Sequence, residues 1–260
     1  MVINLDPVIF TLGPLQVRWY GLMYVAGFLI GTYLLKRFTK QGLFRLETIK
    51  VDALITFMII GIFLGARIFY VFVYNWAYYA QNLTEIPAVW KGGLSFHGGL
   101  LGIVIAMWIF GRKNKLHFLQ LSDWAVIAGC PGIFLVRMGN FINGELWGRV
   151  TDIPLGMIFP SGGPYPRHPS QLYEGLGEGL LLFILLWFLH RRVKINGILT
   201  GIFLMGYSLA RFVIEFFREP DEQLGFFFGG TTTMGQILCF LTFAAGVGVL
   251  LYVRKKKIAI

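Results

Sequence analysis

Long apolar runs alternate with short polar segments along nearly the whole chain. A helix needs about 20 mostly apolar residues to cross roughly 30 Å of hydrocarbon, so such runs favour membrane spans. The third and fourth runs are short and interrupted by glycine. The pattern predicts an all-α integral membrane protein, in which residues 1–260 form a single polytopic domain with seven transmembrane helices at 15–35, 51–74, 94–110, 121–137, 172–189, 197–217 and 234–253.

The composition agrees with this pattern and excludes a large soluble domain. Of the 260 residues, 56% are hydrophobic and 14% are charged, and the mean hydropathy is +0.68. A soluble domain carries about 25% charged residues. The net charge of +10 could indicate nucleic-acid binding. However, the positive charges flank apolar runs, as membrane topology requires, so no nucleic-acid partner is expected.

The distribution of Lys and Arg predicts the orientation of the spans. Seven spans place the two termini on opposite sides, and fifteen of the 23 basic residues fall in the loops of one side. Cytoplasmic loops carry such an excess, so we expect the N-terminus outside and the C-terminus in the cytoplasm. The basic side comprises Lys36, Arg37, Lys40, Arg45, Lys50, Arg112, Lys113, Lys115, Arg191, Arg192, Lys194, Arg254, Lys255, Lys256 and Lys257.

Two connections on the predicted outer side are too long for simple turns. Residues 75–93 contain several Trp and Tyr residues, which suits an external arm at the membrane interface. Residues 138–171 are rich in Gly and Pro, and we interpret them as a small external head segment on the periplasmic side. The start of the chain lacks a basic segment and contains Asp6, so we expect no cleaved signal peptide.

A dense polar block, RMGNFINGELWGR at 137–149, directly follows the fourth apolar run. It holds Arg137 and Arg149 together with Asn140, Asn143 and Glu145. Charge inside or beside a bilayer is costly, so such a block is a candidate functional site. Its glycines allow sharp turns and close approach to a ligand. Arginine forks suit an anion, and phosphate is the abundant anion of a membrane.

The predicted orientation brings polar residues of several spans to a similar depth. Tyr20, Arg67 and His97 lie near the outer ends of the first three spans, and Arg137 ends the fourth. Three residues of the sixth span are spaced by four and share one helix face. The arginine among them lies roughly 20 Å from the inner end. We expect one outward-facing pocket, to which this face contributes Tyr207, Arg211 and Glu215.

Structural roles are the alternative for several of these residues. Arg18 and Arg218 are expected to extend toward the membrane interface, as long basic side chains do. Arg67 could pair structurally with a carboxylate. Arg211 lies too deep to reach either surface easily, and Glu215 is its expected i,i+4 partner.

No metal or cofactor is expected. Cys130 and Cys239 each lie inside an apolar run, without metal-ligand spacing, and we expect neither a disulfide between them nor a nucleophile. The arginines already supply positive charge to the pocket.

Five blocks of the chain resemble, in order, blocks of the bacterial phosphatidylglycerol–prolipoprotein diacylglyceryl transferase family. They are RWYGLMY at 18–24, GGLSFHGGLLG at 92–102, the block at 137–149, RHPSQLYE at 167–174 and RFVIEFFREPD at 211–221. The family form of the central block is close to GR-x-GNF-x-N-x-E-xx-G, and Val136 stands here in place of its leading Gly. We expect the Val136 side chain to pack against neighbouring side chains rather than to contact the substrate.

The resemblance implies a reaction. The family transfers the sn-1,2-diacylglyceryl group of phosphatidylglycerol to the lipobox cysteine of a prolipoprotein signal peptide. A thioether forms and glycerol-1-phosphate is released. The implied location is the bacterial cytoplasmic (inner) membrane, with the active site toward the outer, periplasmic leaflet. The family's functional residues correspond here to Tyr20, His97, Arg137, Asn140, Glu145, Gly148, Tyr207, Arg211 and Glu215.

For this reaction we expect four catalytic residues. Arg137 and Arg211 would bind the phosphate and stabilise the charge that grows as it leaves. Tyr20 would donate a hydrogen bond to a phosphate oxygen. His97 is the candidate base for the thiol, because the ordinary pKa of histidine is about 6.5 and that of a thiol about 8.5. Water or the departing phosphate could take the proton instead.

Further residues are expected to bind substrate or to support the arginines. Asn140 and Asn143 would contact the glycerol head or hold the loop. Glu145 would orient an arginine, since a lone buried arginine is costly. Gly148 would permit close backbone approach. Tyr207 and Glu215 complete the substrate-binding set.

Three other classes of protein compete with this interpretation. A transporter or channel would place its site near the midplane, often within inverted repeats, and we find no repeat. A phospholipid-binding scaffold would need the arginines but not His97. An intramembrane protease would need a paired serine or two aspartates. Ser95 has no obvious activating partner, and Asp52 and Asp123 lie near inner ends.

Overall fold

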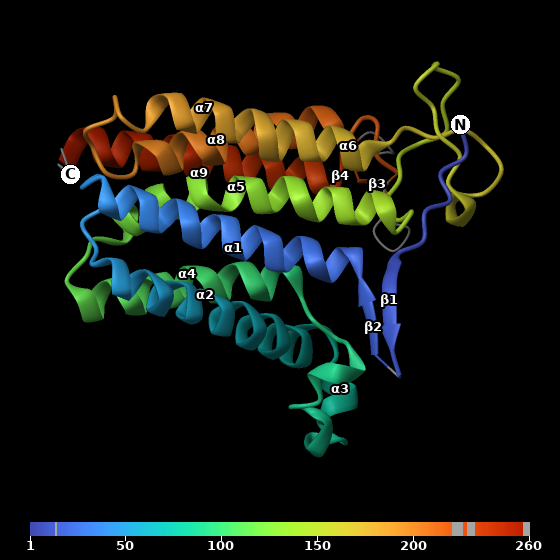
Figure 1. The fold of residues 1–260 in the computed structure, drawn as a ribbon, viewed down its shortest axis with the longest axis horizontal. Helices are drawn as coiled ribbons and strands as arrows, with labels where there is room; N and C mark the ends of the chain where they lie inside the picture. Colours follow the sequence, from blue (N-terminus) through green and yellow to red (C-terminus); the bar gives the residue numbers. More distant parts are fainter. Residues whose placement is uncertain (14, 220–225, 228–231, 257–260) are drawn as a thin grey trace. The chain divides into compact units, whose positions relative to one another are not determined.

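The computed structural model describes residues 1–13, 15–219, 226–227 and 232–256, and helices dominate it (Figure 1). Within these residues, each of the seven predicted spans coincides with a helix or with helical segments joined end to end. They are α1 (Trp19–Lys40), α2 (Thr48–Phe69) with η1 (Tyr70–Tyr74), α4 (Phe96–Asn114), α5 (Phe118–Ile142), α6 (Ser170–Glu174) with η5 (Gly175–Leu181) and α7 (Leu182–Leu189), α8 (Ile198–Ile214) and α9 (Met234–Lys256).

Short elements join these helices. They are β1 (Val8–Leu12), β2 (Leu15–Arg18), α3 (Trp76–Tyr79), η2 (Leu83–Glu85), η3 (Val89–Lys91), η4 (Pro160–Gly162), β3 (Phe226–Phe227) and β4 (Thr232–Thr233). Lys257 of the basic set and the last two residues of the block at 211–221 lie outside the described residues.

Four helical segments of the described chain are long and apolar enough to cross a membrane. They are Thr48–Tyr74, Phe118–Ile142, Ser170–Leu189 and Met234–Lys256. Ile198–Ile214 is apolar but shorter. Large apolar side chains lie exposed along the helices, among them Leu29, Phe63, Phe188 and Phe240. Such a surface suits hydrocarbon rather than water, which confirms the membrane character of the fold.

The first predicted span begins later than expected, because residues 15–18 form strand β2 instead of helix. Leu15 and Val17 alternate there with Gln16 and Arg18, and such alternation is typical of a strand. The strand pairs antiparallel with β1, with Leu12 opposite Leu15. A second antiparallel pair joins β3 and β4. The predominantly helical fold therefore carries two small antiparallel strand pairs that an all-α interpretation omitted.

The fourth helix extends beyond its predicted end at residue 137. Helix α5 continues to Ile142, with Pro131 inside it. Asn140 therefore lies on the same helix as Arg137, one turn further along. The polar block at 137–149 thus begins within a helix rather than in a loop.

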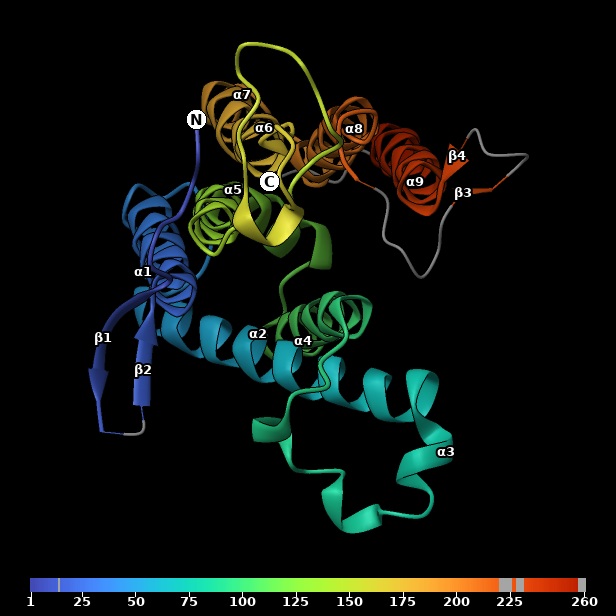
Figure 2. The same cartoon turned by 90° about the vertical axis from the view of Figure 1, so that its right-hand side faces the viewer.

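The residues group into two compact units, one formed by residues 1–35 with 123–260 and the other by residues 36–122. In the first unit, α5, α7, α8 and α9 run side by side (Figure 2). Helix α1 approaches α5 closely, since a Cβ on Gly27 would lie 3.0 Å from the Cα of Gly132. Glycines at such contacts let membrane helices pack backbone to backbone.

In the second unit, α2 and α4 pack through paired glycines. Gly61 and Gly65 on α2 face Gly98 and Gly102 on α4, each pair having GxxxG spacing. A Cβ on Gly61 would lie 2.6 Å from the carbonyl oxygen of Gly102. This arrangement is the usual close contact between membrane helices.

Arg67 organises the arm at residues 75–93 of the second unit. Its buried guanidinium donates to the carbonyl oxygens of Ile86 (2.7 Å), Gly92 (2.7 Å), Gly93 (3.1 Å) and Glu85 (2.8 Å). Arg67 thus holds the arm through backbone carbonyls, whereas a carboxylate partner was one of the two alternatives that the sequence left open. At the arm's surface, the hydrogen bond from Lys91 holds the pKa of Glu85 below its usual range.

Asp123 caps the start of α8 within the first unit. Its carboxylate accepts hydrogen bonds from the backbone N–H of Gly197 (2.7 Å), and from the backbone N–H (2.7 Å) and hydroxyl (2.6 Å) of Thr200. The first N–H groups of a helix lack partners within the helix, so this side chain of α5 fixes where α8 begins.

The α2–α4 contact predicts that Gly102→Ala destabilises the protein. The added methyl group collides with the backbone of Gly61, and overpacking of this kind costs about 1–3 kcal/mol. The melting temperature of the purified protein in detergent should therefore fall. Gly129→Ala is the matched control, because a Cβ there meets nothing within 4 Å. Equal melting temperatures for the two variants would contradict this account of the interface.

Candidate active site

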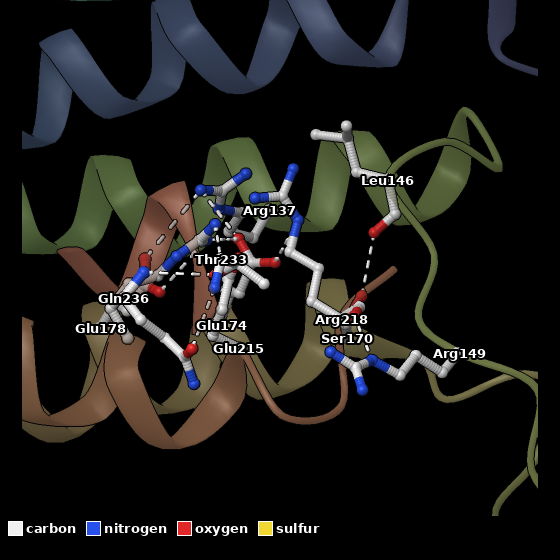
Figure 3. Close-up of polar contacts among 11 residues, drawn as sticks. Arg137, Leu146, Arg149, Ser170, Glu174, Glu178, Glu215, Arg218, Thr233 and Gln236 are labelled. Atoms are coloured by element: carbon white, nitrogen blue, oxygen red, sulfur yellow. Dashed lines mark hydrogen bonds and ion pairs between the residues drawn. The ribbon is translucent and has the colours of Figure 1, made fainter. Parts of the chain in front are cut away.

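Two partly buried arginines, Arg137 and Arg211, meet at one carboxylate in the first unit, and Figure 3 labels Arg137 and the carboxylate residue Glu174. Glu174 on α6 is 0% exposed, and its Oε2 lies 2.8 Å from Nη2 of Arg137 on α5. The same oxygen lies 2.9 Å from Nη1 of Arg211 on α8. The arginine side chains are only 21% and 12% exposed. Three helices therefore converge on a single oxygen atom.

Glu178 adds a second buried carboxylate one helical turn further along. It is 0% exposed, and its oxygens lie 3.9 Å from Arg137 Nη2 and 3.6 Å from Arg211 Nη1. The Tyr207 side chain of α8 lies against Glu178. Glycine makes this convergence possible, because a Cβ on Gly179 would lie 2.7 Å from the backbone nitrogen of Phe134 on α5.

Glu215 completes the pairing of Arg211. Its Oε2 lies 3.0 Å from Nη2 of Arg211, while Thr233 donates its hydroxyl to Oε1 at 2.9 Å. The expected i,i+4 pair is confirmed. A Cβ on Gly235 would lie 2.6 Å from Glu215 Oε1, so glycine at this position admits the carboxylate beside the start of α9.

Arg218 lies in the same cluster, contrary to the expectation that it extends to the membrane interface. Its Nε lies 3.8 Å from Glu174 Oε1, and its side chain is 14% exposed. A carboxylate in a buried, low-dielectric setting attracts a nearby cation more strongly than the same carboxylate does in water. Arg18, by contrast, is exposed and donates to Gln16.

A chain of amides links Arg137 to the polar loop. Asn140 Oδ1 accepts from Arg137 Nη1 at 3.4 Å, and Asn140 Nδ2 donates to Glu145 Oε1 at 2.8 Å. Asn143 Nδ2 donates to the same oxygen at 3.1 Å. Glu145 thus acts on the arginine through Asn140 rather than by direct contact. Tyr20 of α1 lies beside Asn140.

Two fully buried side chains hold the loop in place. Gln171 Nε2 donates to the carbonyl oxygen of Glu145 at 2.6 Å, and Ser170 Oγ donates to that of Leu146 at 2.9 Å. Leu146 has φ +56°, in the left-handed region that non-glycine residues rarely adopt. These two bonds stabilise a strained turn that orients Glu145.

Gly148 allows its loop to approach the backbone of His168 closely, rather than a ligand. Its N–H donates to the carbonyl oxygen of His168 at 2.8 Å, and a Cβ would lie 2.8 Å from that oxygen. Arg149 donates its N–H to Phe217 O and its Nε to Arg218 O, both at 2.9 Å. Burial lowers the pKa of His168 below its usual value.

His97 belongs to the other compact unit. It is the second residue of α4, and its Nδ1 lies 3.0 Å from the hydroxyl of Tyr74. Ser95 caps this helix by accepting from the N–H of Gly98 at 3.2 Å. Within the first unit, the structure brings together Tyr20, Arg137, Asn140, Asn143, Glu145, Tyr207, Arg211 and Glu215, with Gly148 in the adjoining loop.

Comparison with known proteins decides the family. A family model described as prolipoprotein diacylglyceryl transferase matches residues 7–252. The chain is 51% identical over 247 residues to a phosphatidylglycerol–prolipoprotein diacylglyceryl transferase of Nitratidesulfovibrio vulgaris, covering 95% of this chain and 94% of the relative. Relatives with the same name share 48% identity in Pasteurella multocida (90% and 86% covered) and 43% in Pseudomonas aeruginosa (98% and 96%).

The chain belongs to the prolipoprotein diacylglyceryl transferase family.

For a member of this family, the cluster offers paired arginine donors in a buried setting. Arg137, Arg211 and Arg218 lie among Glu174, Glu178 and Glu215. Such donors can bind an anion and stabilise charge that develops on it. Within the described residues, no group of His, Cys, Asp or Glu could hold a metal ion.

The carboxylates on the fifth apolar run were absent from the predicted site. Glu174 closes the RHPSQLYE block, and Glu178 follows by four residues, so the two share a helix face. The sequence could have indicated Glu174 and Glu178, because acidic residues within an apolar run need partners in a membrane. Ser170 and Gln171 gave no comparable signal, since their hydrogen bonds go to the backbone of a distant loop.

The cluster predicts that Arg211→Met strongly destabilises the protein. The substitution leaves three buried carboxylates with fewer cations, and breaking a buried ion pair costs about 3–5 kcal/mol. Thermal unfolding in detergent should begin at a markedly lower temperature. Arg45→Met, at an exposed arginine, should leave the transition nearly unchanged. Similar transitions for the two variants would show that the ion pairs contribute little to stability.

Proposed function

We propose that this chain transfers the diacylglyceryl group of phosphatidylglycerol to a prolipoprotein, as the names of its relatives describe for those proteins. The observation that carries the proposal is the convergence of Arg137 and Arg211 on one buried point, each within 2.9 Å of the same oxygen. Two guanidinium groups so close together can bridge the oxygens of one phosphate. The release of glycerol-1-phosphate and the formation of a thioether are part of the proposal.

The proposed topology has seven crossings of the bacterial inner membrane, with the N-terminus outside and the C-terminus in the cytoplasm. It is supported by the excess of basic residues on one side of the spans. The arm at 75–93 and the head segment at 138–171 would then lie on the periplasmic side. The arginine pair would serve a lipid of the outer leaflet.

The proposed chemistry is a displacement at carbon. The lipobox cysteine loses its proton and attacks C3 of the diacylglyceryl group, so a C–S bond forms. The C–O bond to phosphate breaks, and the bridging oxygen leaves with glycerol-1-phosphate. Arg137 and Arg211 would stabilise the negative charge that moves onto the phosphate.

Supporting roles follow from the contacts of each residue. Asn140 and Asn143 would hold Glu145, and Asn140 would present Arg137. Glu215 would orient Arg211. Tyr20 and Tyr207 would offer hydroxyl groups to substrate near Asn140 and Glu178 respectively. Gly148 would keep the polar loop packed against the backbone of His168.

Proton transfer from the thiol is assigned to His97. An imidazole with one nitrogen held by Tyr74 can present its other nitrogen to a thiol. The neutral imidazole is the form that can accept the proton.

The rival classes are less well supported. Asp52 forms an ion pair with Lys36 at 2.7 Å, and Asp123 caps a helix, so neither aspartate is poised as a protease pair requires. A transporter or scaffold would not need a candidate base. Proteins of those classes would also not be named diacylglyceryl transferases, as the relatives of this chain are.

The decisive test is transfer of a labelled diacylglyceryl group from phosphatidylglycerol to a synthetic lipobox peptide by the purified protein. Wild type should transfer, and Arg137→Ala should lose at least about a hundredfold in rate, as removal of one charge-stabilising donor does. Arg45→Ala is the control at an exposed arginine. A folded wild type that binds phosphatidylglycerol without transfer would favour the scaffold.

The assignment of His97 predicts a change in pH profile. His97→Asn should lower the rate by about 10²–10⁴-fold and change the shape of the pH–rate profile. His117→Asn, at an exposed histidine, should behave as wild type. Near-normal activity of His97→Asn with an unshifted profile would assign the proton to water or to the departing phosphate.

A further inference from the structure

The arginine cluster is balanced by an equal number of carboxylates. Arg137, Arg211 and Arg218 face Glu174, Glu178 and Glu215. Figure 3 shows the labelled side chains of Glu174, Glu178 and Glu215 in one cluster with Arg137. With all six groups ionised, the cluster carries no net charge. It offers hydrogen-bond donors to an anion but no surplus positive charge.

The two carboxylates of the fifth span have different relations to the arginines. Glu174 is bonded to both Arg137 and Arg211 through one oxygen, so it sets the spacing of their guanidinium groups. Glu178 lies 3.6 Å and 3.9 Å from the same guanidinium groups, beyond normal hydrogen-bonding distance. It also lies against the Tyr207 side chain of α8. Glu178 therefore contributes charge more than position.

Phosphate esters differ in charge in a way that this balance can detect. A phosphodiester carries one negative charge, whereas a phosphate monoester at neutral pH carries about 1.5 to 2. Each extra negative charge near buried carboxylates is repelled, and the repulsion is strong where water is excluded. A neutral cluster of donors therefore favours the diester over the dianionic monoester.

We propose that Glu174 and Glu178 set the charge of the headgroup that the arginine pair accepts. The site holds the singly charged phosphodiester of the lipid more tightly than the doubly charged monoester produced from it. Glu174 also acts as a positioning residue, since it holds Arg137 and Arg211 together. The inference rests on the proposed function, in which these arginines bind the phosphate.

Charged and polar groups of several elements face Glu174 and Glu178. They are Arg137 from α5, Arg211 and Tyr207 from α8, Arg218 beyond the end of α8, and Cys239 from α9. Removing one carboxylate charge should strengthen binding of any phosphate ester. The gain should be about twice as large on a logarithmic scale for the dianion, because Coulomb energy scales with charge.

Two soluble probes test this without any need for turnover. Glycerol-1-phosphate is the monoester, and glycerophosphoglycerol, the deacylated headgroup, is the matching diester. Their dissociation constants are measured by calorimetry at pH 8 on the purified full chain. For Glu178→Gln, affinity should rise about tenfold for the monoester and about threefold for the diester. Glu47→Gln, at an exposed glutamate, is the control and should change neither.

Glu174 variants separate charge from position. Glu174→Gln should shift the monoester-to-diester ratio in the same direction as Glu178→Gln and also lower kcat. Glu174→Asp keeps the charge but shortens the side chain, so it should restore the wild-type ratio while kcat stays low. If Glu174→Gln fails to fold, Glu178→Gln decides alone.

The outcomes distinguish this inference from the proposed function. Equal changes in affinity for the two probes, or no change in Glu178→Gln, would overturn the role of the carboxylates even if wild type transfers diacylglycerol. Failure of wild type to transfer, together with the expected shift in probe affinity, would overturn the reaction and leave the charge selection standing. Failure of wild type to bind either probe would overturn the charge selection, and it would overturn the reaction too only if wild type also fails to transfer.

Discussion

A single buried oxygen, Oε2 of Glu174, lies within 2.9 Å of two arginines from different helices, and much of the first unit depends on that contact. Arginine in a membrane environment needs a partner, because an uncompensated charge in a low dielectric is costly. A pocket with two arginines for phosphate must therefore contain carboxylates that stabilise them in the absence of substrate. Glu174 and Glu178 supply them from consecutive turns of one span.

Close helix packing is the geometric condition for that contact. Gly179 lets the fifth span lie against the backbone of α5 at Phe134, and Gly235 admits the carboxylate of Glu215 at the start of α9. In the second unit, the Gly61–Gly102 contact serves the packing of α2 on α4 without any charged group. Membrane helices gain little from the hydrophobic effect against one another, so small residues that allow backbone contact provide the packing in both units.

Much of this architecture could be predicted from hydrophobic runs, because each run of sufficient length corresponds to a helix. The pairing of Arg211 with Glu215 followed from i,i+4 spacing alone. What failed depended on contacts between distant segments. Arg218 was expected at the membrane interface, yet it lies near Glu174. For Arg67 the sequence left open a functional role or a structural pairing with a carboxylate, yet it binds backbone carbonyls of the arm. Glu178 lay unnoticed in an apolar run, since averaging hydropathy over a run hides one buried charge. Residues 15–18 form a strand that was predicted as helix, because alternation over four residues is too short a pattern to stand out beside the apolar run that follows.

Helix α8 shows why an arginine deep in this fold can keep a fixed position. At its start, the carboxylate of Asp123 accepts from the backbone N–H groups of Gly197 and Thr200. At its other end, Glu215 is held by Thr233 and in turn holds Arg211. Anchored at both ends, the helix cannot rotate or slide without breaking charge-assisted hydrogen bonds, which are about twice as strong as neutral ones. The guanidinium of Arg211 is thereby presented to Glu174 in one orientation. A phosphate that arrives there meets donors already in place, and prior placement of this kind is what makes electrostatic stabilisation effective in catalysis.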